Sequence, residues 1–237
     1  MLDIRELSVQ YPDGARALEG LSLSIENGES VALVGANGAG KTTLILALVG
    51  IVASKGEVLV QGLRLEKRTV HEIRRRVGVV FQNPDDQLFM PTIGEDVAFG
   101  PRNLGVSEEE IGPRVEACLH RLRIGHLRHR TALKLSYGEK RMAALATVLA
   151  MEPSVMLFDE PSAFLDPRAR RTLIGVLNGL SQTKLIATHD LNFALETCRR
   201  SVLLKDGKIF ADGPSETLLT DEKIMDACGL EAACAGG

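Results

Sequence analysis

The chain has 237 residues, of which 45% are hydrophobic and 25% charged, and its 28 basic and 31 acidic side chains give a net charge of −3. This length can bury a substantial core in one large domain or two small ones, and the balanced charge gives no electrostatic footprint for nucleic acid. No apolar run is long enough to span a bilayer, and the charged residues 1–6 are unlike a signal peptide, so we expect a cytoplasmic protein.

The first part of the chain reads mainly as β-structure. Residues 1–30 alternate apolar and polar side chains, which predicts strands over 2–7 and 21–25 separated by turns. The apolar run 31–34 predicts a buried strand. Further along we expect a helix over 43–49, strands over 56–60 and 77–81, and a short helix over 70–76.

Helices dominate from about residue 93 to 150. One helix starts at Ser107, which three glutamates follow, and a second opens after Ser136. Strands and helices then alternate: strands over 155–158, 184–188 and 201–204, helices over 166–180 and 191–198, and a hairpin turn at 206–208. This alternation predicts an α/β fold with a largely parallel sheet. Residues 232–237 read as a frayed tail.

The most informative motif follows the apolar run 31–34. Residues 35–42 read Gly-Ala-Asn-Gly-Ala-Gly-Lys-Thr, the phosphate-binding P-loop pattern of a glycine, four residues and Gly-Lys-Thr. Glycines let backbone N–H groups turn toward a triphosphate, and the next helix adds the positive end of its dipole. Lys41 can reach the β- and γ-phosphates, and Thr42 can bind Mg²⁺. The expected phosphate-binding residues are Gly35, Ala36, Asn37, Gly38, Ala39, Gly40, Lys41, Thr42 and Thr43.

Two adjacent carboxylates supply the acidic partner that a P-loop needs. Asp159 ends the apolar run 155–158, where it can hold a Mg²⁺-bound water beside Thr42. Glu160 follows Asp159 directly. Neighbouring carboxylates repel each other and cost stability, so their presence indicates a function. We expect one carboxylate to act on the metal and Glu160 to act as the general base, or to orient the attacking water.

With these motifs the chain resembles the ATPase subunit of an ATP-binding-cassette (ABC) transporter, over nearly its whole length and with every element in the family's order. The resemblance implies that Tyr11 stacks on adenine and that Gln82 senses Mg²⁺ and the attacking water. It implies that His189 contacts the γ-phosphate. Residues 162–166, which end at Asp166, resemble the loop that touches the partner subunit.

Residues 135–139, Leu-Ser-Tyr-Gly-Glu, take the place of the family's signature Leu-Ser-Gly-Gly-Gln. Ser136 and Gly138, which face the partner's phosphate in the family, are kept, and Ser136 also suits a helix N-cap. Tyr137 replaces a glycine and Glu139 a glutamine, which bears on the strength of the contact between subunits rather than on its existence. We expect Glu139 to face solvent or the sugar side, because an acid near a nucleotide is repelled. The sequence assigns no role to Tyr137.

The resemblance also implies an architecture and an active unit. It implies an α/β P-loop NTPase core with a mostly parallel sheet, an N-terminal antiparallel β subdomain and an inserted α-helical signature subdomain. In a single ABC ATPase domain over 1–237, the core with its β subdomain would cover 1–92 and 151–220, the helical subdomain 93–150 and a C-terminal tail of unassigned role 221–237. ATP and Mg²⁺ are the implied cofactors. A second ABC ATPase subunit, identical or paralogous, is the implied partner, because ATP is sandwiched between two subunits in the family.

The segment 80–101 is similar to the energy-coupling-factor group, which imports cobalt, nickel or vitamins, and most of all to its cobalt/nickel ATPase subunits. This likeness implies integral membrane transport subunits as partners, no nucleic acid, and a peripheral place at the cytoplasmic face of the cell membrane. It implies uptake of cobalt or nickel, with vitamin uptake as the alternative. The cargo never touches this subunit, so its residues give no physical reason for a metal cargo.

Three other functions stay open. A soluble ABC ATPase for translation or repair usually carries two cassettes or long coiled-coil insertions, and neither is seen. A nucleotide-binding switch that does not hydrolyse is disfavoured by Glu160 and His189 together. A P-loop kinase for a small molecule would lack a signature helix.

The four cysteines, at positions 118, 198, 228 and 234, contain no Cys-x-x-Cys pair, which favours free thiols in a reducing compartment. Cys118 lies close in sequence to His120, His126 and His129, but this spacing fits no common zinc pattern. Arginines alternate with these histidines, which favours a solvated basic face.

Overall fold

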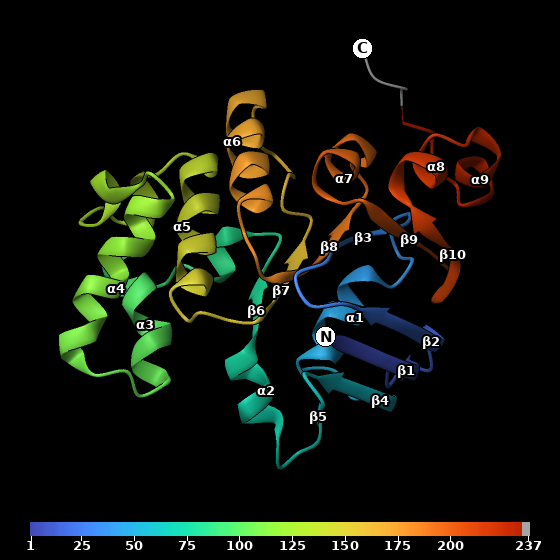
Figure 1. The fold of residues 1–237 in the computed structure, drawn as a ribbon, viewed down its shortest axis with the longest axis horizontal. Helices are drawn as coiled ribbons and strands as arrows, with labels where there is room; N and C mark the ends of the chain where they lie inside the picture. Colours follow the sequence, from blue (N-terminus) through green and yellow to red (C-terminus); the bar gives the residue numbers. More distant parts are fainter. Residues whose placement is uncertain (234–237) are drawn as a thin grey trace.

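Two β-sheets and a set of helices make up the computed structural model, which describes residues 1–233 (Figure 1). The larger sheet has the strand order β10-β9-β3-β8-β7-β6. Its strands are β3 (Ser30–Val34), β6 (Val77–Val80), β7 (Val155–Asp159), β8 (Thr183–Thr188), β9 (Arg200–Lys205) and β10 (Lys208–Pro214). All its pairs are parallel except β9 with β10. The predicted α/β fold with a largely parallel sheet is confirmed.

The parallel strands read as continuous apolar runs because both of their faces are covered. Side chains alternate between the faces, so Ala32 and Val34 pack into a core with the helices. Val31 and Leu33 pack into a second core, with α1 and the smaller sheet. Because parallel strands end at the same edge, the residues that follow β3, β6, β7 and β8 are brought together there.

The smaller sheet is antiparallel and has the order β2-β1-β4-β5. Its strands are β1 (Leu2–Gln10), β2 (Arg16–Ile25), β4 (Lys55–Val60) and β5 (Leu63–Arg64). β1 and β2 are longer than predicted, because a β-bulge interrupts the alternation without ending the strand. Glu6 lies at this irregularity, with a positive φ of 50°.

Three helices stand together at the left of Figure 1: α3 (Ile93–Asn103), α4 (Glu108–Arg121) and α5 (Tyr137–Leu149). The short 3₁₀ segments near them are η1 (Pro84–Asp86), η2 (Gly125–Leu127) and η3 (Ala132–Lys134). The other helices are α1 (Lys41–Leu48), α2 (Val70–Arg76), α6 (Pro167–Asn178), α7 (Leu191–Thr197), α8 (Ser215–Leu219) and α9 (Glu222–Ala227). Among residues 1–233, no helix has the length and apolar character needed to cross a membrane.

The segment after Asp221 packs against the rest of the chain. Met225 and Cys228 are buried, and the N–H group of Ala233 donates to the carbonyl of Leu219 at 2.8 Å. The predicted fraying therefore does not begin at residue 232, and residues 234–237 of that prediction lie outside the described part of the chain.

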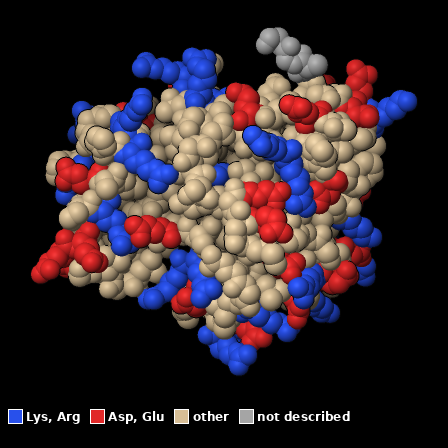
Figure 2. All heavy atoms as spheres, viewed as in Figure 1, with Lys and Arg blue, Asp and Glu red and all other residues tan. Residues whose placement is uncertain are grey.

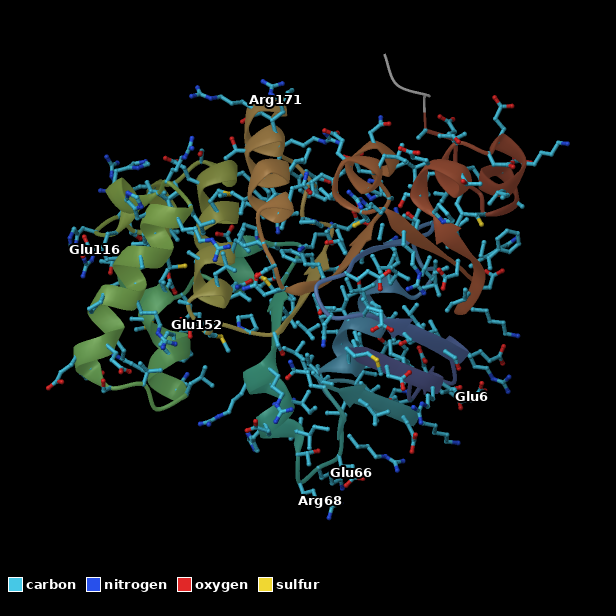
Figure 3. The ribbon with its side chains drawn as sticks, in the orientation of Figure 1. Glu6, Glu66, Arg68, Glu116, Glu152 and Arg171 are labelled. Atoms are coloured by element: carbon cyan, nitrogen blue, oxygen red, sulfur yellow. The ribbon has the colours of Figure 1, made fainter. Side chains whose placement is uncertain are left out.

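Charged side chains of both signs are interspersed on the face that Figure 2 shows. Figure 3 places Glu66 and Arg68 at the outer tip of the segment between β5 and α2, and Arg171 at an outer end of α6. Glu66 and Arg68 pair with each other at 2.9 Å. The charges of Glu66 and Arg68 therefore interact with each other at the surface.

Candidate functional site

The segment between β3 and α1 takes its shape from three glycines, which are required for different structural reasons. A side chain at Gly35 would collide with the carbonyl of Leu204, and a Cβ at Gly40 would lie 2.6 Å from the carbonyl oxygen of Ala17. Gly38 has free space around it but a φ of +82°, a conformation that glycine adopts without strain. The turn therefore depends on close backbone approach at two positions and on backbone conformation at the third.

Lys41 lies at the first position of α1 and is buried against this turn. Its Nζ atom donates to the carbonyl oxygens of Gly35 at 2.7 Å and Ala36 at 3.3 Å. The same atom lies 3.6 Å from the carboxylate of Glu160. The ammonium group is thus held over the mouth of the turn, where exposed backbone N–H groups and the start of α1 favour an anion.

Asp159 ends β7 and is only 4% exposed. One carboxylate oxygen, Oδ2, accepts a hydrogen bond of 2.9 Å from the hydroxyl of Thr42. The other, Oδ1, is buried without a hydrogen-bond partner among residues 1–233. Burial raises the pKa of Asp159, and the neighbouring Glu160 adds to the rise. A buried carboxylate oxygen without a partner, beside a hydroxyl, is an oxygen-donor pair that fits Mg²⁺.

Glu160 is held by the end of β8. Its backbone φ of +44° is rare outside glycine and costs about 1–3 kcal/mol. Its Oε2 atom accepts hydrogen bonds from the hydroxyl of Thr188 at 3.2 Å and from the N–H group of His189 at 3.3 Å. The imidazole Nδ1 of His189 lies 2.9 Å from the same oxygen. The side chain of Glu160 is 8% exposed and that of His189 58%, so the imidazole stands between a buried carboxylate and solvent.

A hollow of about 570 Å³ brings most of the predicted site residues together. Its wall includes Tyr11, Asn37, Gly38, Gly40, Lys41, Thr42, Thr43, Gln82, Asp159, Glu160 and His189. In this wall the hydroxyl groups of Tyr11 and Thr43 share a hydrogen bond of 3.0 Å, which fixes the aromatic ring beside the hollow. The hollow also includes Arg16 and Phe164, which the sequence analysis did not single out. Phe164 lies in the loop 162–166, which the sequence did indicate as a contact to a partner subunit. An aromatic residue in an exposed loop is the signal that could have identified Phe164.

Ser136 and Gly138 lie outside the hollow, at the N-terminus of α5. The hydroxyl oxygen of Ser136 accepts a hydrogen bond from the N–H group of Glu139. In return, the carboxylate of Glu139 accepts hydrogen bonds of 2.8 Å each from the N–H group and the hydroxyl of Ser136. This capping box lowers the pKa of Glu139. The carboxylate therefore turns toward its own helix and not simply toward solvent, because a helix N-terminus attracts an acid. A Cβ at Gly138 would lie 2.9 Å from that of Ala169, so a glycine allows α5 and α6 to approach closely.

Asp166 also lies outside the hollow and caps α6. Its Oδ1 atom accepts hydrogen bonds from the N–H groups of Arg168 at 2.8 Å and Ala169 at 2.9 Å. Two of the groups that α6 would otherwise leave unpaired are satisfied in this way. Within a single chain, Asp166 therefore has a structural role at the start of the helix.

The basic segment around the histidines takes no part in the hollow. Residues 1–233 contain no group of three or more His, Cys, Asp or Glu side chains that could hold a metal ion. Cys118, Cys198 and Cys228 are free and buried. Burial raises the pKa of Cys118 and of Cys198 to about 11, so both are protonated thiols at neutral pH.

Comparison with known proteins identifies relatives along the whole chain. Residues 18–163 match the model of the protein family described as "ABC transporter". A putative ABC transporter ATP-binding protein of Gloeobacter violaceus is 52% identical, over 97% of this chain and 96% of its own. The energy-coupling factor transporter ATP-binding protein EcfA of Carboxydothermus hydrogenoformans is 43% identical, over 98% and 87%.

Solved structures share the fold closely. The structure of cbiO1 from Clostridium perfringens, described as part of the ABC transporter complex cbiONQ, has a TM-score of 0.85 and 34% identity, over 95% of this chain and 93% of its own. A dimeric structure of the ATP-binding cassette MJ0796, bound to ADP and phosphate, has a TM-score of 0.80 and 26% identity, over 91% and 99%.

Proposed function

This chain belongs to the ABC transporter family, and we propose that it is the ATP-hydrolysing subunit of an importer of the energy-coupling-factor type, coupling ATP turnover to uptake of cobalt or nickel through separate membrane subunits. The observation that carries the proposal is the hollow of about 570 Å³, where the P-loop, two buried carboxylates, Gln82 and His189 meet. The metal cargo is supported by the likeness to cbiO1 and by the segment 80–101, and vitamin uptake is the alternative.

ATP binding would use groups that are already in place. The N–H groups of residues 35–42 and the start of α1 would surround the phosphates, and Tyr11 would stack on adenine from the wall of the hollow. Lys41 would exchange its bonds to the carbonyls of Gly35 and Ala36 for bonds to the β- and γ-phosphates. Mg²⁺, held by Thr42, Asp159 and Gln82, would neutralise charge that develops on the phosphates.

Hydrolysis would use the one oxygen of Glu160 that the fold leaves available. Oε2 is held by Thr188 and His189, whereas the contact of Oε1 is with the Lys41 ammonium, 3.6 Å away. Once Lys41 turns to the phosphates, Oε1 can accept a proton from the attacking water. His189, which stands at the solvent side, would hold the carboxylate and contact the γ-phosphate.

A second ABC ATPase subunit, identical or paralogous, would complete the site. Ser136 is exposed at the N-terminus of α5 and lies outside the hollow of its own chain, so it would meet a nucleotide held by another chain. In this arrangement 1–92 and 151–220 form the nucleotide-binding core, and 93–150 form a helical subdomain that carries Ser136 and Gly138. Membrane subunits would hold the pair at the cytoplasmic face of the membrane.

The proposal is tested by purifying the tagged chain from detergent-solubilised membranes in the presence of ATP, followed by mass spectrometry of the proteins that accompany it. A polytopic membrane protein and a second ABC ATPase subunit are the expected partners. The small substrate-capturing protein in the complex, of metal type or vitamin type, decides the cargo. ATPase activity without any membrane partner would replace the transporter role with that of a soluble ABC ATPase.

A further inference from the structure

Tyr137, the signature residue that stands where the family has a glycine, connects α5 to two loops of the hydrolysis site. Its hydroxyl donates to the backbone carbonyl of Gln82 at 3.0 Å. Its ring lies edge-on to that of Phe164, with centroids 5.8 Å apart and planes at 79°. The loop after β6 and the loop after β7 therefore meet on one side chain of the signature helix.

A buried arginine strengthens the first of these connections. Arg141 is 1% exposed, and its guanidinium donates to the carbonyls of Phe81, at 2.6 Å, and Gln82. It also donates to the hydroxyl oxygen of Tyr137 at 3.0 Å and lies 5.5 Å from the centre of that ring. Burial lowers the pKa of Arg141, yet a guanidinium remains charged in proteins. A buried charge is costly unless its partners stay in place, so the carbonyls of Phe81 and Gln82 are held firmly against α5.

The rest of this loop is also attached to α5. Lys140 pairs with Asp85 at 2.6 Å, and the side-chain amide of Gln87 donates to the carbonyl of Ala144 at 2.9 Å and the hydroxyl of Thr147 at 2.7 Å. The segment 81–87 is therefore held against α5 at several points along its length. Only the Gln82 side chain of this segment lines the hollow, so its placement there depends on how its carbonyl is held.

The ring of Tyr137 stabilises the position of Phe164. Phe164 is 80% exposed, lines the hollow, and has a positive φ of 60°, a strained backbone conformation for a side chain of this size. An exposed ring with a strained backbone needs a contact that favours this position over others, and Tyr137 provides one. A glycine in place of Tyr137 would leave Phe164 without this aromatic partner and the Gln82 carbonyl without the phenol.

We propose that Tyr137 is a positioning residue that fixes Gln82 and Phe164 relative to the N-terminus of α5, so that the end offered to a second subunit stays aligned with this chain's own hydrolysis site. The inference rests on the proposed ATP hydrolysis. It assigns the hydroxyl of Tyr137 an effect on turnover that passes through Gln82, and the ring an effect that passes through Phe164, without contact between Tyr137 and the nucleotide of its own chain.

The test uses Tyr137→Phe, which removes the hydroxyl and keeps the ring, in the full-length chain with the partners that co-purify with it. The variant loses the bond to the Gln82 carbonyl and the bond from Arg141. We expect kcat to fall about threefold to tenfold, in the range of the neutral hydrogen bond that reaches Gln82, with KM for ATP unchanged. In a Gln82→Ala background, where the backbone carbonyl remains but no side chain is left to misplace, Tyr137→Phe should have no further effect. The proposal would be overturned if the double variant lost kcat by the product of the two single-variant factors. An unchanged kcat in Tyr137→Phe alone would also overturn it.

A readout without nucleotide complements the kinetics. In the nucleotide-free chain, we expect the backbone amides of residues 85–88 to exchange hydrogen faster in Tyr137→Phe than in the wild type, and equal rates would count against the positioning role of Tyr137. If Tyr137→Phe does not fold, Phe164→Leu tests the ring contact: it should lower kcat, and wild-type kcat would overturn the proposal. Phe210→Leu is the matched control, because Phe210 is also an exposed phenylalanine, at 47%, but lies against Lys205.

The experiments distinguish a wrong function from a wrong role for Tyr137. If the wild type hydrolyses no ATP and matches Glu160→Gln, the proposed function is wrong. If the wild type hydrolyses ATP, Glu160→Gln does not, and Tyr137→Phe equals the wild type, only the role of Tyr137 is wrong.

Discussion

Replacement of Glu160 by glutamine is the sharpest test of the hydrolysis site, because the structure separates the duties of its two carboxylate oxygens. A glutamine can keep its carbonyl oxygen at Oε2, where the hydroxyl of Thr188 and the N–H group of His189 still donate to it. Its amide nitrogen then takes the place of Oε1, 3.6 Å from Lys41. That atom can accept no proton, and two donors face each other there.

The expected loss is large and confined to turnover. Removal of a general base costs a factor of about 10² to 10⁴, which corresponds to about 3–5 kcal/mol in the barrier. ATP affinity should change little, because Lys41 keeps the carbonyls of Gly35 and Ala36 as partners until the phosphates replace them. Glu160→Gln should therefore trap ATP without hydrolysing it.

Phosphate release measures turnover, and equilibrium dialysis with labelled ATP measures binding. Glu116→Gln is the matched control, because Glu116 lies on α4 at the periphery in Figure 3, is 75% exposed and, among residues 1–233, pairs only with Arg128. Surface pairs of this kind contribute about 0–1 kcal/mol, so this variant should behave as the wild type. Wild-type turnover in Glu160→Gln would refute the assignment of the base.

Three further variants test the neighbouring groups. Lys41→Ala should weaken ATP binding itself by about tenfold or more, because a charge-assisted contact to phosphate is lost, and equilibrium dialysis would contradict this if affinity were unchanged. Asp159→Asn should raise the melting temperature of the Mg²⁺-free, nucleotide-free chain near pH 7, because the raised pKa of Asp159 shows that its ionised form is penalised in the folded state. The increase in melting temperature should be full above the raised pKa of Asp159. It should disappear as the pH falls through that pKa to the ordinary carboxyl range. An increase that does not depend on pH would refute the penalty on ionised Asp159 as its cause. Asp166→Ala should cost about 1 kcal/mol through the lost cap of α6, a shift of about 2–4 °C in a thermal melt, whereas Asp166→Asn should retain most of it.

The sequence predicted the parts of this protein that depend on short stretches of chain. The octapeptide 35–42 between an apolar run and a helix predicted the phosphate-binding turn, because glycine conformations and helix starts are local properties. The apolar run 155–158 predicted a buried strand with Asp159 at its end. The order of such elements predicted a parallel sheet, and parallel strands necessarily end at one edge.

Local patterns misjudged the places where a distant segment intervenes. Strand β1 continues to Gln10, past the predicted end at residue 7, because the sheet accommodates an irregularity at Glu6 that breaks the alternation. Glu139 was expected to face solvent or the sugar side; its side chain is 38% exposed, but the capping box that it closes with Ser136 was not anticipated. Arg141 follows Glu139 and Lys140 at the start of α5, so its local sequence gives no sign that its side chain is buried.

The duties of Tyr137, Arg141 and Phe164 were decided by the tertiary structure alone. Tyr137 and Arg141 bind backbone carbonyls 55 to 60 residues away, and a carbonyl carries no side-chain identity that a sequence could record. Phe164 meets Tyr137 only because β6, β7 and α5 converge. The sequence by itself determined which chemistry this chain can perform, since that follows from residue types at fixed local spacing. Which residues hold that chemistry in position was settled by packing between distant segments.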